Sequence, residues 1–333
     1  MNRTDTNQAL KHPVVNHALL MGALATQHDV LLDLIGNRPL HYVDLPVHGN
    51  IGDLLIMLGT LAFFHHNHLV PKVSAAAFAY EPAWIAPGDV VVFHGGGNFG
   101  DLYAEYGMQG LREQVADRYR GNRIVVLPQT LYFSSQAAMR RSAAVFRRHP
   151  DLHLCVRDRI SYDIARNFTD NVYLLPDMAH QLYRLTSRHE GPHGTLRIQR
   201  TDDERAEAGA VSGLEIVTTT DWPMVVGDGE RRIALFRHGM RALHKYGLGW
   251  YGNKLLAGLW ADYARHLVQQ ATTLFAAHEH IVTDRLHGHI LACLMDKPNT
   301  VLDNSYGKNA TYVNAWTGNS ELVTLQAASA EKI

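Results

Sequence analysis

Residues 281–298 read IVTDRLHGHILACLMDKP, a strand, a turn and a helix in immediate succession. Ile281 and Val282 form the apolar run of a buried strand, and residues 290–295 carry the apolar spacing of a helix that Pro298 ends. A buried strand that leads straight into a helix is the unit from which parallel α/β sheets are built. The stretch therefore predicts an α/β fold.

The turn of this stretch places Arg285, His287 and His289 within five residues. Helix N-termini attract anions, arginine grips carboxylates and phosphates with two donors, and histidine exchanges protons near neutral pH. We therefore expect a site for a phosphorylated or carboxylated substrate and acid–base chemistry. Arg285 and His287 can converge only if the helix begins near Gly288, since in a continuous helix Arg285 and His289 would share a face.

The same alternation of strands and helices runs along the chain. Buried strands separated by helices predict parallel sheets covered on both faces. The expected strands are 40–47, 89–93, 123–127, 152–156, 172–175, 195–199, 214–219, 279–283 and 299–303. The expected helices are 53–65, 109–119, 135–147, 159–167 and 251–277, with a short helix or loop over 202–210.

A segment rich in Gly, Pro and His, SRHEGPHGT at 187–195, interrupts this alternation. We place a domain boundary there, between residues 1–190 and residues 191–333. The predicted architecture is two Rossmann-like domains facing a cleft. Ligands of such sheets bind beyond the carboxyl ends of the strands, so polar clusters at strand ends are the candidate site residues.

Composition restricts the function classes. The 333 residues carry a net charge of −1 with histidine neutral, which gives no overall reason to expect a nucleic-acid partner. The two cysteines, Cys155 and Cys293, are far apart and form no CxxC motif, so neither a cysteine zinc site nor a disulfide framework is expected. No signal core and no uncharged apolar run of ~20 residues is present, so we predict a cytoplasmic protein.

The first strand-end cluster is GNIGD at 49–53. Its glycines let the backbone turn closely around a ligand, and Asp53 stands at the start of the expected helix. Asn50, Gly52 and Asp53 are candidate site residues. The alternative is that Asp53 only caps the helix.

The second cluster is HGGGNFGD at 94–101. It formally matches GxGxxG, but it lies outside the first βα unit and no acidic residue ends the next strand, so a nicotinamide site is excluded. The oxyanion loop of lipase-like hydrolases would need a GxSxG motif, which the sequence lacks. We expect a Gly-rich loop whose backbone N–H groups, with Gly95, Gly96 and Asn98, face an oxygen-rich ligand. Tight packing without a ligand is the alternative.

The third cluster, VRDRIS at 156–161, ends a strand with a basic pair. Arg157 is a candidate anion ligand, and a surface ion pair with a nearby aspartate is the alternative. Weaker strand-end candidates are Pro128-Gln129-Thr130, Pro176-Asp177 and Arg200-Thr201-Asp202.

Taken in order, these motifs resemble those of the polysaccharide pyruvyl transferase family over roughly residues 38–315. The motifs are GNIGD at 49–53, HGGGNFGD at 94–101, LPQT at 127–130, VRDRIS at 156–161, LPDMA at 175–179, TDRLHGHI at 283–290 and DNSYGKN at 303–309. The resemblance implies a glycosyltransferase-B-like fold with the acceptor on the first domain and the donor motif on the second. It implies transfer of pyruvate from phosphoenolpyruvate to a sugar of a bacterial exopolysaccharide, capsule or cell-wall glycan precursor, as a ketal.

That reaction suggests a role for each matched residue. His287 would be the general acid and Asp53 would orient the acceptor or act as base, while Arg157 and Arg285 would bind the donor's two anionic groups. His289 is the reserve acid, and a buried or capping histidine is its alternative. Further substrate contacts are expected at Leu286, Asn50, Gly52, Gly95, Gly96, Asn98, His289 and Lys308. Phosphoenolpyruvate is a co-substrate, and neither a metal nor a tightly bound cofactor is expected.

Two other functions remain open at this point. A nucleotide-sugar-dependent glycosyltransferase fits the same fold, and a catalytically silent glycan-binding subunit is the third reading. A lipid-linked acceptor would bring the protein to the inner face of the membrane. The aromatic segment Tyr246–Trp260 could serve that contact, and packing inside the second domain is its alternative.

Overall fold

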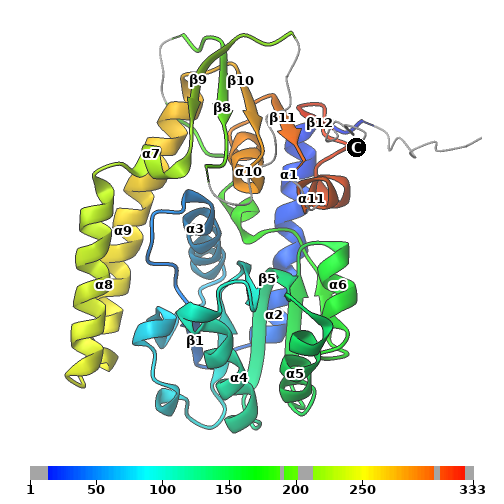
Figure 1. Ribbon diagram of the computed structural model, residues 1–333. Helices are drawn as coiled ribbons and strands as arrows, with labels where there is room; N and C mark the ends of the chain where they lie inside the picture. Colours follow the sequence, from blue (N-terminus) through cyan, green and yellow to red (C-terminus); the bar gives the residue numbers. More distant parts are fainter. Residues whose placement is uncertain (1–13, 188–190, 202–212, 304–307, 327–333) are drawn as a thin grey trace, which may run out of the picture.

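The computed structural model of the chain describes residues 14–187, 191–201, 213–303 and 308–326. Its strands form two parallel sheets, which lie one above the other in Figure 1. The α/β class with parallel sheets is therefore confirmed. The first sheet takes its strands from residues 40–174 and the second from residues 195–326, and the division at residue 190 stays a prediction.

The first sheet is covered by helices on both faces, because its strands carry apolar side chains on both sides. In pairing order its strands are β2 (Val73–Ala75), β1 (Leu40–Val43), β3 (Val90–Phe93), β5 (Arg123–Tyr132), β6 (Leu152–Val156) and β7 (Val172–Leu174), and β4 (Gly96–Gly100) pairs with the second half of β5. Its helices are α2 (Val30–Ile35), α3 (Ile51–His66), α4 (Met108–Arg118), α5 (Gln136–Phe146) and α6 (Arg159–Ala165).

The second sheet repeats the strand order of the first. Its strands pair in the order β9 (Ile216–Thr220), β8 (Thr195–Ile198), β10 (His280–Thr283), β11 (Asn299–Leu302) and β12 (Val323–Gln326). Its helices are α7 (Trp222–Val226), α8 (Gly229–Lys245), α9 (Gly249–Ala276), α10 (Leu286–Leu294) and α11 (Lys308–Trp316). In each sheet, the second strand along the chain pairs with one side of the first strand, and the third strand pairs with the other side of the first strand. The strand order therefore reverses between β1 and β3 and again between β8 and β10, and such switch points are where ligands bind.

Helix α3 lies at the centre of the molecule between the two sheets (Figure 1). It packs against α9, α10 and the short 3₁₀ helix η5 (Met178–Leu182), and 11 of its 16 residues are buried. A Cβ on Gly59 would lie 2.1 Å from the carbonyl oxygen of Met178, so only glycine permits this close approach. One apolar core, which includes α3, therefore joins both sheets. The other 3₁₀ helices are η1 (Gln27–Asp29), η2 (Ala77–Ala79), η3 (Pro82–Trp84) and η4 (Ala104–Tyr106).

The first described residues pack on the second half of the chain. Val15 forms a parallel bridge with Ser320, and the two ring nitrogens of His17, the first residue of α1 (His17–Thr26), bond Ser320 Oγ at 2.7 Å and the Cys293 carbonyl at 2.8 Å. His17–Ile35 is the one described helical stretch long and apolar enough to cross a membrane by length and composition. It is divided into α1, η1 and α2, and one side of it is buried.

Several element ends differ from the prediction. Strand β1 ends at Val43 because Asp44 has a φ of 73°, which no extended strand contains. Strand β5 continues past Pro128 to Tyr132, because an irregularity in its pairing with β6 accommodates the missing N–H. Helix α9 runs unbroken for 28 residues. The predicted helix or loop over 202–210 lies outside the described residues.

Candidate active site

The carboxyl ends of the two sheets meet at a cavity of about 560 Å³. From the first sheet it is lined by residues that follow or end strands: Asp44 after β1, His94 after β3, Thr130 in β5 and Arg157 after β6. From the second half come Arg200 after β8, Trp222 after β9, Arg285, Leu286 and His287 after β10, and Asn309 and Tyr312 of α11. The cavity therefore joins the two switch points, which is where the strand-end clusters were expected to converge.

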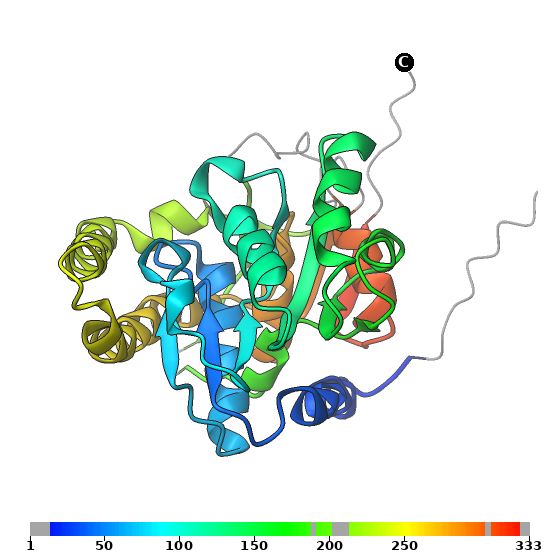
Figure 2. The ribbon, with the colours of Figure 1, turned by 90° about the horizontal axis from the view of Figure 1, so that it is seen from below.

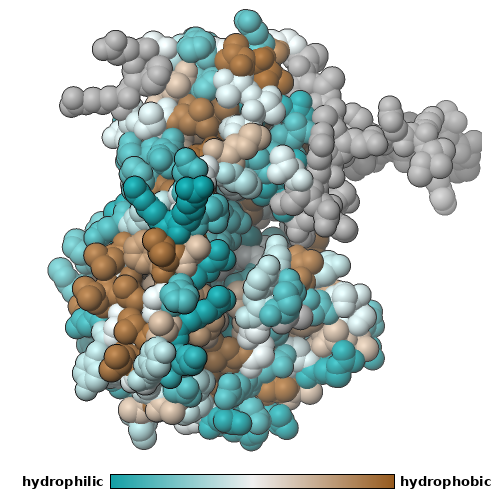
Figure 3. Space-filling model, turned by 60° about the vertical axis from the view of Figure 1, so that its left-hand side comes forward, coloured by the Kyte–Doolittle hydropathy of each residue, from teal (hydrophilic) through white to brown (hydrophobic). Residues whose placement is uncertain are grey.

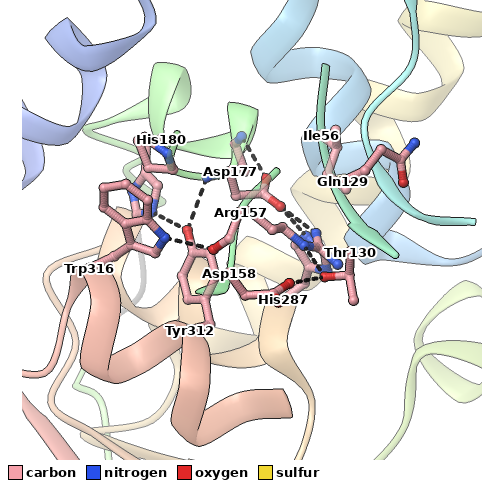
Figure 4. Close-up of polar contacts among 12 residues, drawn as sticks. Ile56, Gln129, Thr130, Arg157, Asp158, Asp177, His180, His287, Tyr312 and Trp316 are labelled. Atoms are coloured by element: carbon pink, nitrogen blue, oxygen red, sulfur yellow. Dashed lines mark hydrogen bonds and ion pairs between the residues drawn. The ribbon is translucent and has the colours of Figure 1, made fainter. Parts of the chain in front are cut away.

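A buried carboxylate, Asp177, links the two halves of the site. Its Oδ2 accepts a hydrogen bond from Arg157 Nη1 at 2.6 Å and contacts His287 Nε2 at 3.2 Å (Figure 4). Arg157 Nε donates to Thr130 Oγ1 at 3.0 Å, which fixes the plane of the guanidinium group. One carboxylate thus orients an arginine of the first half and a histidine of the second.

Helix α11 holds Asp177 in place from the opposite side. Tyr312 Oη accepts a hydrogen bond from the Asp177 N–H at 3.1 Å and contacts His180 Nε2 at 2.9 Å, and Trp316 Nε1 donates to the Arg157 carbonyl at 2.8 Å (Figure 4). Burial acts to raise the pKa of Asp177, but the charges of His287 and Arg157 outweigh it and hold that pKa well below its ordinary value. Asp177 is therefore a carboxylate at any physiological pH.

The ring of His287 has one nitrogen left for chemistry. Its Nε2 faces Asp177, so Nε2 carries a proton, and Nδ1 has no hydrogen-bond partner in the described part of the chain. A buried carboxylate on one ring nitrogen stabilises a positive charge on the ring and fixes its orientation. At the edge of the cavity, this pair can give a proton to a bound molecule or take one from it.

Arg285 is held by a second buried carboxylate. Its Nη2 donates to Asp221 Oδ2 at 2.6 Å, and its Nε bonds the other carboxylate oxygen. Burial acts to raise the pKa of Asp221, but the bonds from Arg285 and Thr201 lower it overall. Arg285 and Arg157 therefore line the cavity with fixed orientations.

The helix after this motif begins before Gly288. A start near Gly288 was expected to be required for Arg285 and His287 to converge, and this condition was wrong: α10 begins at Leu286, and Arg285 is its N-cap with an extended backbone (φ −97°, ψ 127°). Because Arg285 stands outside the helix, its direction is independent of the helical spacing that separates it from His287. Both side chains reach the cavity wall for this reason.

The GNIGD cluster makes room for the His287 ring and also contributes side chains to the cavity wall. Asn50, not Asp53, is the N-cap of α3, and its side chain accepts from the Gly52 N–H at 3.0 Å. A Cβ on Gly52 would lie 2.6 Å from His287 Nδ1, so glycine makes room for the imidazole ring. Asp53 and Asn50 line the cavity, and Asp53 Oδ2 lies 3.7 Å from His48 Nε2.

The HGGGNFGD segment is a strand rather than the expected loop. Residues 96–100 form β4, and Gly95 and Gly100 lie against β5: a Cβ would meet the Pro128 carbonyl oxygen at 2.8 Å and the Tyr132 carbonyl oxygen at 1.7 Å. The packing alternative therefore accounts for these two glycines. Gly97 and Asn98 do line the cavity, with Asn98 Oδ1 accepting from Arg112 Nη2 at 2.6 Å.

Two other predicted contacts have different outcomes. His289 is fully buried away from the cavity lining, with Nδ1 on Asn299 Oδ1 at 2.7 Å and Nε2 on Thr317 Oγ1 at 2.8 Å. Burial lowers the pKa of His289 to about 4, which favours the neutral ring, and the structure does not bring this expected reserve acid and substrate contact to the cavity. Lys308 begins α11, but its side chain lies outside what the structure describes.

Three residues of the site were not predicted from the sequence or were only weak candidates. Asp177 was only a weak candidate, and Asp221 was not considered, although Asp221 directly follows β9 and Asp177 lies three residues beyond β7. His94 bonds the Tyr42 hydroxyl through Nδ1 at 2.7 Å, while its Nε2 is buried without a partner in the described residues. Burial lowers the pKa of His94 to about 3, so a neutral ring lines the cavity. The rule that polar residues at strand ends are site candidates would have found all three.

The chain has relatives among known proteins. A sequence model of the polysaccharide pyruvyl transferase family matches residues 50–306. EpsO of Bacillus subtilis (strain 168), whose name describes it as a pyruvyl transferase, is 40% identical over 86% of this chain and 88% of its own length. Pyruvyl transferase 1 of Schizosaccharomyces pombe is 26% identical over 68% of this chain and 54% of its own length. An uncharacterised Klebsiella pneumoniae protein of known structure shares the fold, with a TM-score of 0.56 and 20% identity over 92% of this chain and 99% of that one.

Proposed function

The chain belongs to the polysaccharide pyruvyl transferase family and is a pyruvyltransferase, and we propose that its donor is phosphoenolpyruvate. The acceptor in this proposal is a sugar of a bacterial exopolysaccharide, capsule or cell-wall glycan precursor, and the product is a pyruvate ketal. We further propose a glycosyltransferase-B-like arrangement, with the acceptor on the first half and the donor on the second, in a cytoplasmic enzyme.

The observation that carries the proposal is the shared carboxylate of Arg157 and His287. Phosphoenolpyruvate has two anionic groups and a methylene carbon that must be protonated, so its site needs cations and an acid side by side. Asp177 fixes one arginine and the histidine relative to each other, and Arg285 is fixed nearby by Asp221. Arg157 Nη2 lies near Gly97 on the cavity wall and has no partner in the described residues, so it can bind an anionic oxygen.

In the proposed reaction, His287 is the acid and Asp53 is the base. The His287 imidazolium gives a proton to the methylene carbon, which makes C2 an oxocarbenium-like centre. A sugar hydroxyl attacks C2, and its proton passes to Asp53. A second hydroxyl then forms the other C–O bond while the C2–O bond to phosphate breaks. One of the two hydroxyl protons restores the proton given to carbon, and the other leaves with phosphate.

The function is tested with the purified enzyme, phosphoenolpyruvate and several lipid-linked and soluble glycans. We expect inorganic phosphate release that depends on the acceptor, and mass spectrometry of the glycan should show one added pyruvyl group. Turnover of a nucleotide-sugar with no phosphate release from phosphoenolpyruvate would instead establish the glycosyltransferase function. Binding of glycan with neither reaction would establish the silent subunit.

Replacement of Arg285 by lysine tests the donor site. Lysine keeps the charge. It lacks the planar guanidinium group, so it cannot bind both Asp221 oxygens and an anion at the same time. We expect KM for phosphoenolpyruvate to rise ~10- to 100-fold, as the loss of a charge-assisted hydrogen bond would give. The KM for the acceptor should change little. An unchanged donor KM would mean that Arg285 serves only to hold Asp221.

Replacement of Gly52 by alanine tests the position of the His287 ring. The new Cβ would overlap the ring, so the imidazole must shift, and its contact with Asp177 would be disturbed. Misplacement by about 1 Å can cost ~10²-fold, and we expect a loss of that order in kcat. Gly110→Ala in α4 is the matched control, since a Cβ there meets nothing within 4 Å. Equal turnover of both variants would show that the ring position is not needed.

A further inference from the structure

The helical hairpin α8–α9 stands at one edge of the molecule and exposes large apolar side chains. Figure 2 shows the two helices side by side at that edge. Figure 3, in which this side comes forward, shows hydrophobic side chains gathered among hydrophilic ones. The most exposed of the hairpin are Tyr251 (79%), Tyr246 (73%), Leu235 (72%), Leu255 (67%), Leu248 (53%) and Leu259 (48%).

These side chains form one continuous outward face and are not isolated exposed apolar residues. Tyr251, Leu255 and Leu259 are four residues apart in α9, so they lie on one side of that helix. The opposite side of α9 is already buried, with Trp260 donating to the Pro46 carbonyl at 2.8 Å. Packing inside the second half of the chain, one of the two expected roles of the segment Tyr246–Trp260, is therefore present, and the membrane contact stays a prediction. The inner face packs in the core, and the outer face has no covering element among the described residues.

The same hairpin carries a concentrated positive charge. Residues 231–261 contain six arginines and lysines and not one aspartate or glutamate, although the whole chain has a net charge of −1. Arg231, Arg232, Arg241, Lys245 and Lys254 are exposed. Exposed leucine and tyrosine beside arginine and lysine are the composition of helices that lie in the interface of an anionic membrane.

We propose that the α8–α9 hairpin docks on the surface of an anionic lipid bilayer. Its apolar side chains would enter the interface, and its basic side chains would meet the lipid phosphates. A second copy of the chain fits this face less well, because a symmetric contact would bring the two basic surfaces together. Charge complementarity therefore favours the lipid.

This docking would also place the active site at the membrane. That part of the proposal rests on the proposed function. Arg237 and Arg241 of α8 line the cavity, and the Arg241 guanidinium lies 4.8 Å from the ring centre of Phe78, another cavity residue. Leu235 and Lys245 of the same helix are exposed. One helix thus contributes to the cavity and to the docking face, so an acceptor held in the bilayer by a lipid would reach the cavity beside α8.

Vesicle sedimentation tests the docking without any substrate. The whole protein is mixed with phosphatidylcholine vesicles that contain or lack phosphatidylglycerol. We expect binding to the anionic vesicles only, weakened by added salt. The Tyr251→Ser, Leu255→Ser double variant should bind on the order of tenfold more weakly, because two apolar side chains no longer enter the interface.

The control is Ile160→Ser, which removes another exposed apolar side chain from α6, on the far side of the molecule (Figure 1). It should bind the vesicles as the unchanged protein does. The double variant should keep full turnover with a soluble acceptor, which separates a docking defect from a catalytic one. Absence of vesicle binding, or a dimer in solution that the double variant abolishes, would overturn the proposal.

Discussion

The Asp177→Asn variant is expected to lose ~10²–10⁴-fold in kcat, the range in which positioned acid–base groups contribute. Asp177 is fully buried and bonds both Arg157 and His287. An amide keeps the size of the side chain but removes the charge. His287 would then lose the partner that stabilises its protonated form, and Arg157 would lose its counter-ion. Steady-state phosphate release, measured against donor concentration, gives the kcat.

The same substitution should also destabilise the protein. Removing one partner of a buried ion pair costs ~3–5 kcal/mol, because the remaining charge has no partner. Urea unfolding measures this loss, and turnover must be measured where the variant stays folded. Asp170→Asn is the matched control, because Asp170 pairs with Arg147 on the surface and its side chain is 89% exposed. Full activity of Asp177→Asn would show that His287 works without a carboxylate partner.

The His287→Ala variant is expected to lose ~10²–10⁴-fold in kcat, with a smaller loss of unfolding free energy than Asp177→Asn because Arg157 still pairs with Asp177. The ring lies at the cavity edge, so its removal leaves the core intact. Because alanine leaves a space of the shape of the ring, free imidazole added to the assay should restore part of the turnover. That rescue would identify a lost proton donor rather than a general disturbance.

His289→Ala provides the contrast within the same motif. His289 bonds Asn299 and Thr317 in the core, so its loss should cost ~1–3 kcal/mol of stability while the folded enzyme keeps its kcat. Near-normal turnover of His287→Ala without added imidazole would transfer the acid role to another group. His94, the neutral ring with an unpartnered buried nitrogen, would be the next residue to test.

Most elements of the fold could be predicted from local patterns. The strands β3, β6 and β10 and the helix α5 lie within one residue of their expected bounds, because apolar runs and helical spacing are local signals. Elements without such a signal were missed. Strand β4 consists largely of glycine, and α8 has few buried residues.

The position of the candidate site could be predicted from the sequence better than the contacts that each of its residues makes. The strand-end rule placed Asn50, Asp53, Asn98, Arg157, Arg285, Leu286 and His287 on one cavity, because parallel strands bring their carboxyl ends to one edge. It could not distinguish His287 from His289. Those two residues differ in what surrounds them, and the surroundings come from α11, β11 and the segment around Asp177.

The sequence alone determined the α/β class, the order of most strands and helices, and the motif whose turn carries Arg285 and His287. Each of these depends on residues that are neighbours along the chain. Only the tertiary structure decided which histidine faces the cavity and which carboxylate holds it. His287 and Asp177 are 110 residues apart and meet because α3, η5 and α10 pack into one core. A side chain's charge and tautomer depend on such distant contacts, which the spacing of residues along a chain does not specify.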